Sequence, residues 1–276
     1  TAPLSAKLAL LRALPKAPGV VMRGLGYVLG LKRAGVPLHF GVKSPRFLGE
    51  SRVTGIEWQQ GGRTNHLDAD GVGYGFGLKP EAQLADLMGC TFVFSERDRA
   101  HIPLRDPAGR TDVTGLYIAG DAARIKGADA AEIAGERAAL ALIEDRGLPV
   151  NRARTRDLEM ALEEFSAVRD ALEAAFPFPE NWTIAEETTL CRCEDIRAGE
   201  ARAAMQHFGI SEINRLKAVS RVGMGRCQGR ICGTAAAELL AAETGRPVCG
   251  VGRLRAQPPI KPVPLTLLAS DTENPT

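Results

Sequence analysis

Long uninterrupted apolar segments are absent from this 276-residue sequence, although 45% of its residues are hydrophobic. The apolar stretch near the N-terminus is broken by Lys7, Arg12, Lys16 and Arg23, and it does not reach the length needed to span a bilayer. Its pattern indicates amphipathic helices and not a signal peptide. We therefore expect no transmembrane segment and a cytoplasmic protein, with peripheral attachment to a membrane left open.

A marked excess of one charge is also absent. Lysine and arginine total 35 and the acidic residues total 33, which gives a formal net charge of +2. The arginines are spread along the chain among acidic residues, a pattern typical of solvated surface and not of a nucleic-acid-binding stripe. We expect no nucleic-acid partner.

Two familiar signatures are missing as well. No G-x-G-x-x-G motif opens a strand–helix unit, because Gly24 and Gly26 have neither a preceding strand nor the third glycine. The histidines show no mutual spacing suited to a metal site or a catalytic triad, so surface or capping roles are expected for His39, His66, His101 and His207.

The first half of the chain alternates strand-like and helix-like segments. Strands are predicted at 36–40, 51–59, 90–96 and 116–120, and helices at 81–89 and about 129–145. Such alternation indicates an α/β fold with parallel strand pairing.

The second half changes character. Apolar residues recur at helical spacing over 153–176, and this single amphipathic helix should end at Pro177 and connect two domains. Three short helices are predicted at 201–209, 211–219 and 233–245, and the proline-rich tail should be extended.

Four of the six cysteines form two short-spaced pairs, Cys191 with Cys193 and Cys227 with Cys232. Without an export signal, thiols are expected to persist as ligands and not as disulfides. Four thiolates are the number that a 2Fe-2S cluster or a structural zinc ion requires. Zinc remains the main alternative, although neither pair has the C-x2-C form usual in zinc ribbons. The other two, Cys90 and Cys249, are expected to be small buried apolar residues.

The second cysteine pair lies in a glycine-dense loop that leads into a helix starting near Gly233. Glycine allows sharp turns and lets backbone N–H groups approach sulfur, and the helix start adds positive dipole. The arginines Arg226 and Arg230 are placed to offset negative charge, which should raise a cluster's reduction potential. The glycines concerned are Gly223, Gly225 and Gly229.

The strings LCRCEDI and LKAVSRVGMGRCQGRICG resemble the bacterioferritin-associated-ferredoxin-like 2Fe-2S domain. The C-x4-C spacing departs from the small ferredoxin itself. It is similar to the version fused to the FAD/2Fe-2S alpha-type subunits of opine oxidase, hydrogen cyanide synthase and dye-linked proline or hydroxyproline dehydrogenases. This resemblance implies a cluster held by Cys191, Cys193, Cys227 and Cys232.

A second motif begins with Gly120 and Asp121, at the end of a predicted strand. Gly120 would allow close backbone approach, and Asp121 could accept a hydrogen bond from a ribityl hydroxyl. An isolated Gly-Asp would favour simple turn chemistry. The whole string 111–142, however, resembles the C-terminal flavin motif of thioredoxin-reductase-like flavoproteins, in which the following helix touches the flavin ring. The corresponding positions here are Ala128, Asp129 and Ala130; aspartate departs from the polar amide of that family.

These resemblances imply an α/β, partial two-dinucleotide-domain flavoprotein fold followed by a small all-α 2Fe-2S domain. The expected boundaries are 1–149 for the C-terminal part of the FAD/NAD(P)-type region, 150–185 for the connecting helix and linker, 186–249 for the 2Fe-2S domain and 250–276 for the tail. The chain should correspond to the C-terminal part of a longer subunit, with FAD or FMN bound without the ADP-binding half.

The implied function is that of an FAD- and 2Fe-2S-dependent oxidoreductase subunit. It would transfer electrons in a heteromeric dehydrogenase that oxidises the C–N bond of an amino acid, imino acid or opine. The substrate site is expected on an amino-acid-oxidase-like flavoprotein partner, and a small ferredoxin-like subunit is a further expected partner. The alternatives are a zinc-stabilised non-redox binding or scaffold module and a stand-alone ferredoxin-like donor; no catalytic residue is assigned.

Overall fold

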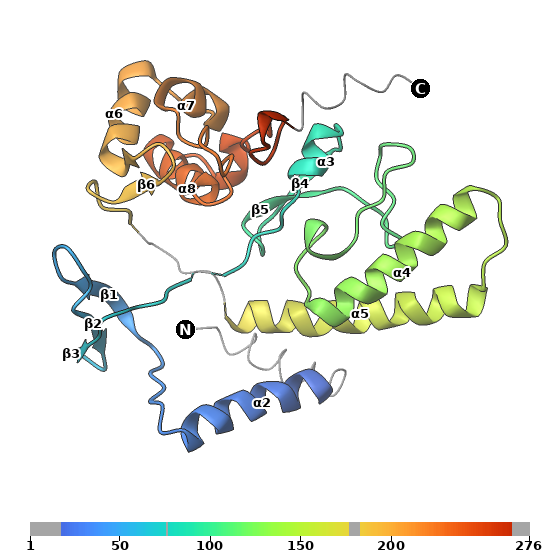
Figure 1. Ribbon diagram of the computed structural model, residues 1–276, viewed down its shortest axis with the longest axis horizontal. Coiled ribbons are helices and arrows are strands. Elements are labelled where there is room, and N and C mark those ends of the chain that lie inside the picture. The colour runs from blue at the N-terminus through green and yellow to red at the C-terminus, as the bar shows by residue number, and fades with distance from the viewer. Residues whose placement is uncertain (1–17, 76, 177–182, 267–276) are drawn as a thin grey trace. The chain divides into compact units, whose positions relative to one another are not determined.

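The computed structural model describes residues 18–75, 77–176 and 183–266, which divide into two compact units (Figure 1). The first unit comprises the described residues of Thr1–Leu78 and Glu164–Phe178. The second comprises those of Lys79–Glu163 and Pro179–Thr276. These units are divided at other positions than the sequence-based domains, whose boundaries remain predictions.

The first unit contains helix α2 (Pro18–Arg33) and a three-stranded meander of β1 (Lys43–Leu48), β2 (Gly55–Gln60) and β3 (Arg63–Asp68). Strands β2 and β3 pair from Gln60 with Arg63 onward, across a two-residue Gly61-Gly62 turn whose φ values are both positive. Such a turn fits the twist of an antiparallel hairpin. The strand predicted at 36–40 does not form, and the one predicted at 51–59 begins only at Gly55.

The second unit opens with helix α3 (Gln83–Leu87) and the antiparallel hairpin of β4 (Phe92–Ser95) and β5 (Ala100–Pro103). The strand predicted at 116–120 is reduced to one isolated bridge between Arg110 and Tyr117. All strand pairs within the described residues are antiparallel, so the expectation of parallel pairing was wrong. The connections are short hairpins, whereas parallel strands need long crossovers.

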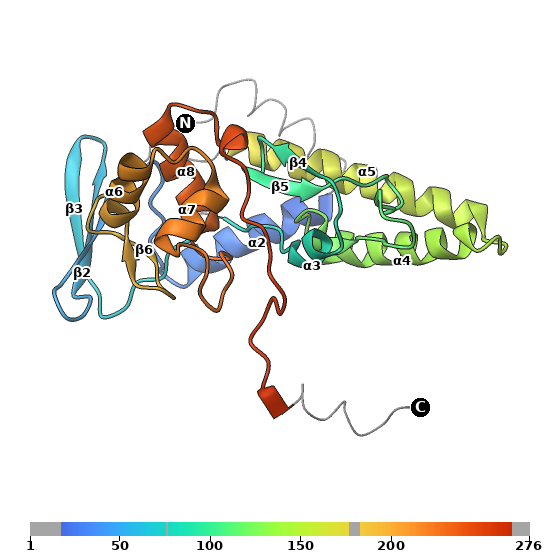
Figure 2. The ribbon, with the colours of Figure 1, turned by 90° about the horizontal axis from the view of Figure 1, so that it is seen from above.

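Two long helices follow, α4 (Ala128–Asp145) and α5 (Arg152–Ala175), after the 3-10 turn η2 (Gly120–Ala122). The N-terminal half of α5 lies beside α4 in both ribbon views (Figures 1 and 2). Arg137 of α4, only 5% exposed, donates from Nε to Glu159 of α5 at 2.8 Å. The apolar periodicity predicted both helices to within one residue at each end.

The cysteine-containing part of the second unit begins with a small hairpin and continues as a helical bundle. Its elements are β6 (Thr189–Cys191), β7 (Ile196–Arg197), α6 (Ala198–Phe208), α7 (Ile213–Ser220), α8 (Gly233–Thr244) and the 3-10 turn η3 (Val248–Val251). The three predicted helices are confirmed. The hairpin of β6 and β7, however, corrects the expectation of an all-α domain.

Side chains at the helix ends explain why these helices start and stop where they do. The Glu212 carboxylate accepts hydrogen bonds from the backbone N–H groups of Asn214 and Arg215 at 2.9 Å, which caps α7. Helices α6 and α8 end at Gly209 and Gly245, both in the left-handed conformation. The helices then enclose one continuous core that includes Ile213, Leu216, Val222, Leu240 and Val251.

No helix in the described part of the chain combines the length and the apolarity that crossing a membrane demands.

Candidate functional site

The two cysteine motifs meet in the second unit. Cys191 ends strand β6 and Cys193 lies in the turn that follows, while the other two cysteines lie in the loop between α7 and α8. The thiols approach one another as two pairs, each with one member from either motif. Cys191 lies within interaction range of Cys232, and Cys193 within interaction range of Cys227.

The two pairs differ in their surroundings. Cys191 and Cys232 are 1% and 2% exposed, whereas Cys193 is exposed and Cys227 half-buried. Burial raises the pKa of Cys232 to about 12, and the charge and hydrogen bond of Cys191 and the charge of Cys227 act in the same direction. Cys232 is therefore protonated until a cation displaces its proton, as metal binding to a thiol requires.

Backbone N–H groups favour the charged form of Cys227. Burial would raise the pKa of Cys227, but hydrogen bonds from the backbone of Ile231, from Cys193 and from the backbone of Gly229 and Arg230 hold it below its ordinary value. Such N–H groups directed at sulfur are also a means by which proteins tune iron–sulfur centres.

Two glycines of the loop leave no room for a side chain. A Cβ on Gly225 would lie 2.1 Å from the Cβ of Cys193, and one on Gly229 would lie 2.5 Å from Leu254 Cδ1. Gly229 also has a φ of 78°, in the left-handed region. The close approach of the two cysteine motifs therefore depends on glycine at position 225, while Gly229 allows the loop its left-handed turn against Leu254.

The four thiols are ligands of the right chemistry for a metal centre, but in the described residues they are not gathered into one. In residues 18–75, 77–176 and 183–266, no three His, Cys, Asp or Glu side chains converge so that they could hold one metal ion. Two cysteine pairs, in contrast, match the two irons of a 2Fe-2S cluster, since each iron takes two thiolates.

The structure corrects two sequence-based expectations near this site and confirms a third. Cys90 is buried at 4% exposure, as predicted. Cys249 is exposed, because the turn η3 directs Val251 and not Cys249 into the core. Arg230 does not stand as an isolated cation near the cysteines, because its guanidinium is paired with Glu81. Arg226 is exposed.

The flavin-type motif lies between β5 and α4. Gly120 has a φ of 63°, and a Cβ there would meet the Cβ of Ala131 on α4 at 3.3 Å. Helix α4 begins at Ala128, and no side chain caps its first turn. Asp121, Ala128 and Asp129 are exposed, whereas Ala130 is 2% exposed.

This geometry fits a flavin. An uncapped helix start offers N–H groups and positive dipole to the ring atoms that gain negative charge on reduction, and exposed Asp121 offers a carboxylate to a hydroxyl. The motif at Gly120 and Asp121 and the cysteine loop belong to different segments of the second unit.

A charge network holds the segment before this motif against the C-terminal end of α4. Arg110 donates to Glu144 at 2.7 Å and to Asp145 at 2.9 Å, and these carboxylates, together with Asp106, raise its pKa. The Tyr117 hydroxyl donates to Asp145 at 2.6 Å. Ion pairing thus supports this region where apolar packing is sparse.

A seam of polar contacts joins residues 79–103 to the cysteine-containing part, and sequence reasoning missed it. Its members are the ion pairs of Arg230 with Glu81, Arg253 with Asp86 and Arg99 with Glu238, and the hydrogen bond from Gln83 to the Gln228 carbonyl. The partners are separated by 139 to 167 residues. Spacing along the sequence carries no signal for contacts of such range.

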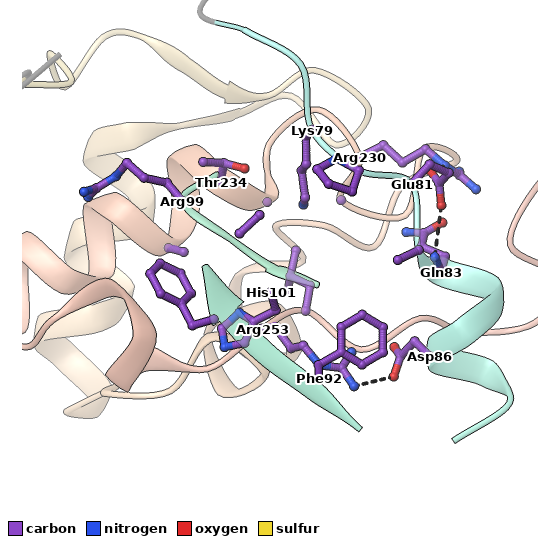
Figure 3. A pocket seen from close by; sticks show the side chains of 18 of the residues that line it. Lys79, Glu81, Gln83, Asp86, Phe92, Arg99, His101, Arg230, Thr234 and Arg253 are labelled. Carbon is purple, nitrogen blue, oxygen red and sulfur yellow. Dashed lines mark hydrogen bonds and ion pairs between the residues drawn. The ribbon is translucent and has the colours of Figure 1, made fainter. Parts of the chain in front are cut away.

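Asp86 is the most buried member of the seam, at 7% exposure. Its carboxylate accepts from Arg253 at 2.7 Å, drawn in Figure 3, and from the Ala256 backbone at 2.6 Å. Burial alone would raise the pKa of Asp86, but these hydrogen bonds and the charges of Arg253 and Arg255 hold it below its ordinary value. The carboxylate is therefore charged at neutral pH and faces the guanidinium groups of Arg253 and Arg255.

Comparison with known proteins gives a consistent result. Residues 186–272 match the sarcosine oxidase A3 domain. The A subunit of opine oxidase from Agrobacterium tumefaciens is 32% identical over 255 residues, which are 90% of this chain and 50% of that protein. The HcnB subunit of hydrogen cyanide synthase from Pseudomonas aeruginosa is 31% identical over 92% of this chain and 57% of that protein. The chain thus spans about half the length of the curated relatives it matches.

The fold is also similar to that of a solved structure. The L-proline dehydrogenase from P. horikoshii superimposes with a TM-score of 0.65 at 21% identity, over 88% of this chain and 47% of that chain. Taken together, the chain is a homologue of HcnB and of the opine oxidase A subunit, and its cysteine-containing part matches the sarcosine oxidase A3 domain.

Proposed function

We propose that this chain is the electron-transfer part, carrying a 2Fe-2S cluster and a flavin, of a heteromeric dehydrogenase acting on the C–N bond of an amino acid, imino acid or opine. Its relatives support the class: they are subunits of an opine oxidase and of a hydrogen cyanide synthase, and the structural neighbour is a proline dehydrogenase.

The observation that carries the proposal is the pairing of the four thiols across two motifs. Cys191 with Cys232 and Cys193 with Cys227 would each hold one iron. A bound 2Fe-2S cluster supplies one-electron transfer. The chain's own contribution is to bury one cysteine pair, to direct backbone N–H groups at Cys227 and to leave Cys193 exposed on the side open to a partner.

The flavin would lie against Gly120, Asp121 and the first turn of α4, at Ala128, Asp129 and Ala130. A flavin supplies the exchange between two-electron and one-electron chemistry. Asp121 would hold a hydroxyl of the flavin chain, and the first turn of α4 would stabilise negative charge on the ring. Either FAD or FMN is compatible with these contacts.

The substrate site belongs, in this proposal, to a partner of the amino-acid-oxidase type, and a small ferredoxin-like protein is a second partner. The names of the relatives, which are those of enzyme subunits, support a multi-subunit assembly. The described residues offer no acid–base pair that we assign to substrate chemistry.

Metal analysis of the purified complex tests the central claim. We expect about two irons and about two acid-labile sulfides per chain, and a brown colour that dithionite bleaches. Cys191→Ser should remove both the iron and the transfer of electrons to a dye. Cys249→Ser is the matched control, because Cys249 is exposed and outside the paired set, and it should retain both.

One zinc per chain without sulfide would contradict the proposal and favour the scaffold alternative. Full dye reduction by the Cys191→Ser complex would contradict the electron-transfer role even if iron were present.

A further inference from the structure

A pocket of about 300 Å³ lies along the seam between residues 79–101 and the cysteine-containing part (Figure 3). One wall is formed by the chain that enters α3 and by the hairpin of β4 and β5. The other is formed by the loop that carries Cys227 and Cys232, by the start of α8 and by residues 252–254. Neither the thiol pairs nor the flavin-type motif line it, so it is distinct from both sites above.

The three arginines of the pocket wall each form an ion pair with a carboxylate of the protein. Arg99 pairs with Glu238 at 2.6 Å and Arg253 with Asp86 at 2.7 Å, while Arg230 pairs with Glu81. These pairs hold the walls together. Their charges are therefore largely offset within the protein.

Lys79 is different. In the described part of the chain it makes no ion pair, and its side chain points into the pocket in Figure 3. Its Nζ lies 3.5 Å from the place that a Cβ on Gly233 would occupy, at the N-terminus of α8. Lys79 as a whole residue is exposed, and the ionisable groups that face its amine are Glu81 and Cys232. An ammonium group that makes no ion pair attracts an anion that enters the pocket.

The start of α8 adds to this preference. The helix has 12 residues, begins at Gly233 and has no capping side chain, and its second residue, Thr234, lines the pocket with a hydroxyl group. The partial positive charge of the helix N-terminus and the Lys79 ammonium therefore act on the same region of the cavity.

The remaining surface is apolar and partly aromatic. Phe92, Phe94 and Leu254 line the pocket together with small aliphatic residues. The guanidinium of Arg253 covers the Phe92 ring at 4.0 Å, and His101 packs edge-on against Phe94 with ring centroids 5.1 Å apart. A ligand that fills this volume needs an apolar body as well as a charged end.

We propose that this pocket binds a small organic anion, with a single carboxylate or phosphate group at Lys79 and Thr234 and an apolar ring or chain against Phe92, Phe94 and Leu254. A volume of about 300 Å³ is at the lower end of small-molecule sites, which sets the size of the ligand. The bound anion would contact both sides of the seam.

The site has a consequence for the cysteine loop. Gly233 follows Cys232 directly, so a ligand at the start of α8 lies beside the segment that positions two of the four thiols. Binding is expected to hold this segment against residues 79–101, because contacts to both walls are made only when the seam is closed.

Isothermal titration of the full chain at pH 7 tests the proposal with three probes of similar size: benzoate, phenyl phosphate and the neutral benzyl alcohol. At least one of the two anions should bind more tightly than the alcohol. Lys79→Gln should weaken that anion about tenfold or more, because a charge-assisted hydrogen bond is lost, and should leave the alcohol unchanged. Lys79→Arg keeps the charge and should retain most of the affinity.

Lys43→Gln on β1 is the control for a change in net charge, and it should bind the anion as the unmodified chain does. Tighter binding of benzoate than of phenyl phosphate would identify a carboxylate ligand, and the reverse a phosphate. Equal binding of all three probes, or an anion affinity that survives Lys79→Gln, would overturn the proposal. These measurements need no cluster, so they fail or succeed separately from the electron-transfer function.

Discussion

The cysteine-containing part of the second unit and the residues 79–145 before it, here called the flavin-type segment, are stabilised in different ways. The former encloses a continuous core whose largest fully buried side chains include Ile213, Leu216 and Leu240. The latter has only a small core of Ala85, Cys90, Ile118 and Ala123. The ion pairs of Arg110 and of the polar seam provide stabilising contacts in this segment, where apolar packing is sparse.

This contrast predicts which substitutions should destabilise each region. A domain that buries many apolar side chains loses stability when one of them is shortened, because a cavity remains. A region held by ion pairs responds instead to the removal of a charge and to pH. The predictions below test this difference.

The largest effect is expected from shortening a side chain in the larger core. Leu240→Ala removes a residue with no exposed surface and should cost about 2–5 kcal/mol in the free energy of opening. Hydrogen exchange of peptides from α6, α7 and α8 should show the loss together, because these helices share one core.

Ile118→Ala is the matched variant in the smaller core. Ile118 is 7% exposed and contacts few buried neighbours, so its loss should fall at the lower end, about 2 kcal/mol or less, and be confined to peptides near 109–123. Equal losses for the two variants would show that the two regions do not differ as argued.

The same contrast explains what the sequence could predict. Helices α4 to α8 follow from apolar periodicity and local stop signals such as Gly209 and Gly245, because a helix bonds within its own segment. The two cysteine motifs were also recognisable from their short spacings, although the structure places each thiol beside one from the other motif. Those parts of the fold are encoded locally.

Contacts between residues far apart in the sequence could not be predicted from local sequence patterns. The predicted parallel strands failed because short strand-like runs do not specify their partner, and the meander of β1, β2 and β3 is instead fixed by hairpin turns. In the sequence, Asp86, Arg253 and His101 are indistinguishable from ordinary surface residues. Only the fold brings them to the seam and its pocket.

The next largest effect concerns that seam. Asp86→Asn removes the negative charge that Arg253 and Arg255 face, and it should cost about 2 kcal/mol, as expected for hydrogen bonds to a charged group. Hydrogen exchange should rise in peptides covering 79–103 and 252–256, and not in α6. Asp68→Asn, at an exposed position on β3, is the control and should change little.

The pH dependence sharpens this test. Since the pKa of Asp86 is lower in the folded chain than its ordinary value of 3.8, its contribution is fully present above that value and is lost as the pH falls through the lowered pKa. The unmodified chain and Asp86→Asn should therefore differ at pH 7 and converge well below about pH 3.8. A difference that persists unchanged in acid would contradict an electrostatic seam.

The smallest changes in stability are expected when either of two glycines in the flavin-type segment is replaced by alanine. Gly135 lies in the middle of α4, and no atom lies within 4 Å of a Cβ added there. Gly135→Ala should stabilise the helix by about 0.5–1 kcal/mol, because glycine is a poor helix former. Gly120→Ala should act in the opposite direction, because Gly120 has a φ of 63° and its new Cβ would press on Ala131 at 3.3 Å. Hydrogen exchange of α4 peptides measures both changes. Stabilisation by both substitutions would mean that the turn at Gly120 is not held against α4, and the close approach on which the flavin contact depends would then be lost.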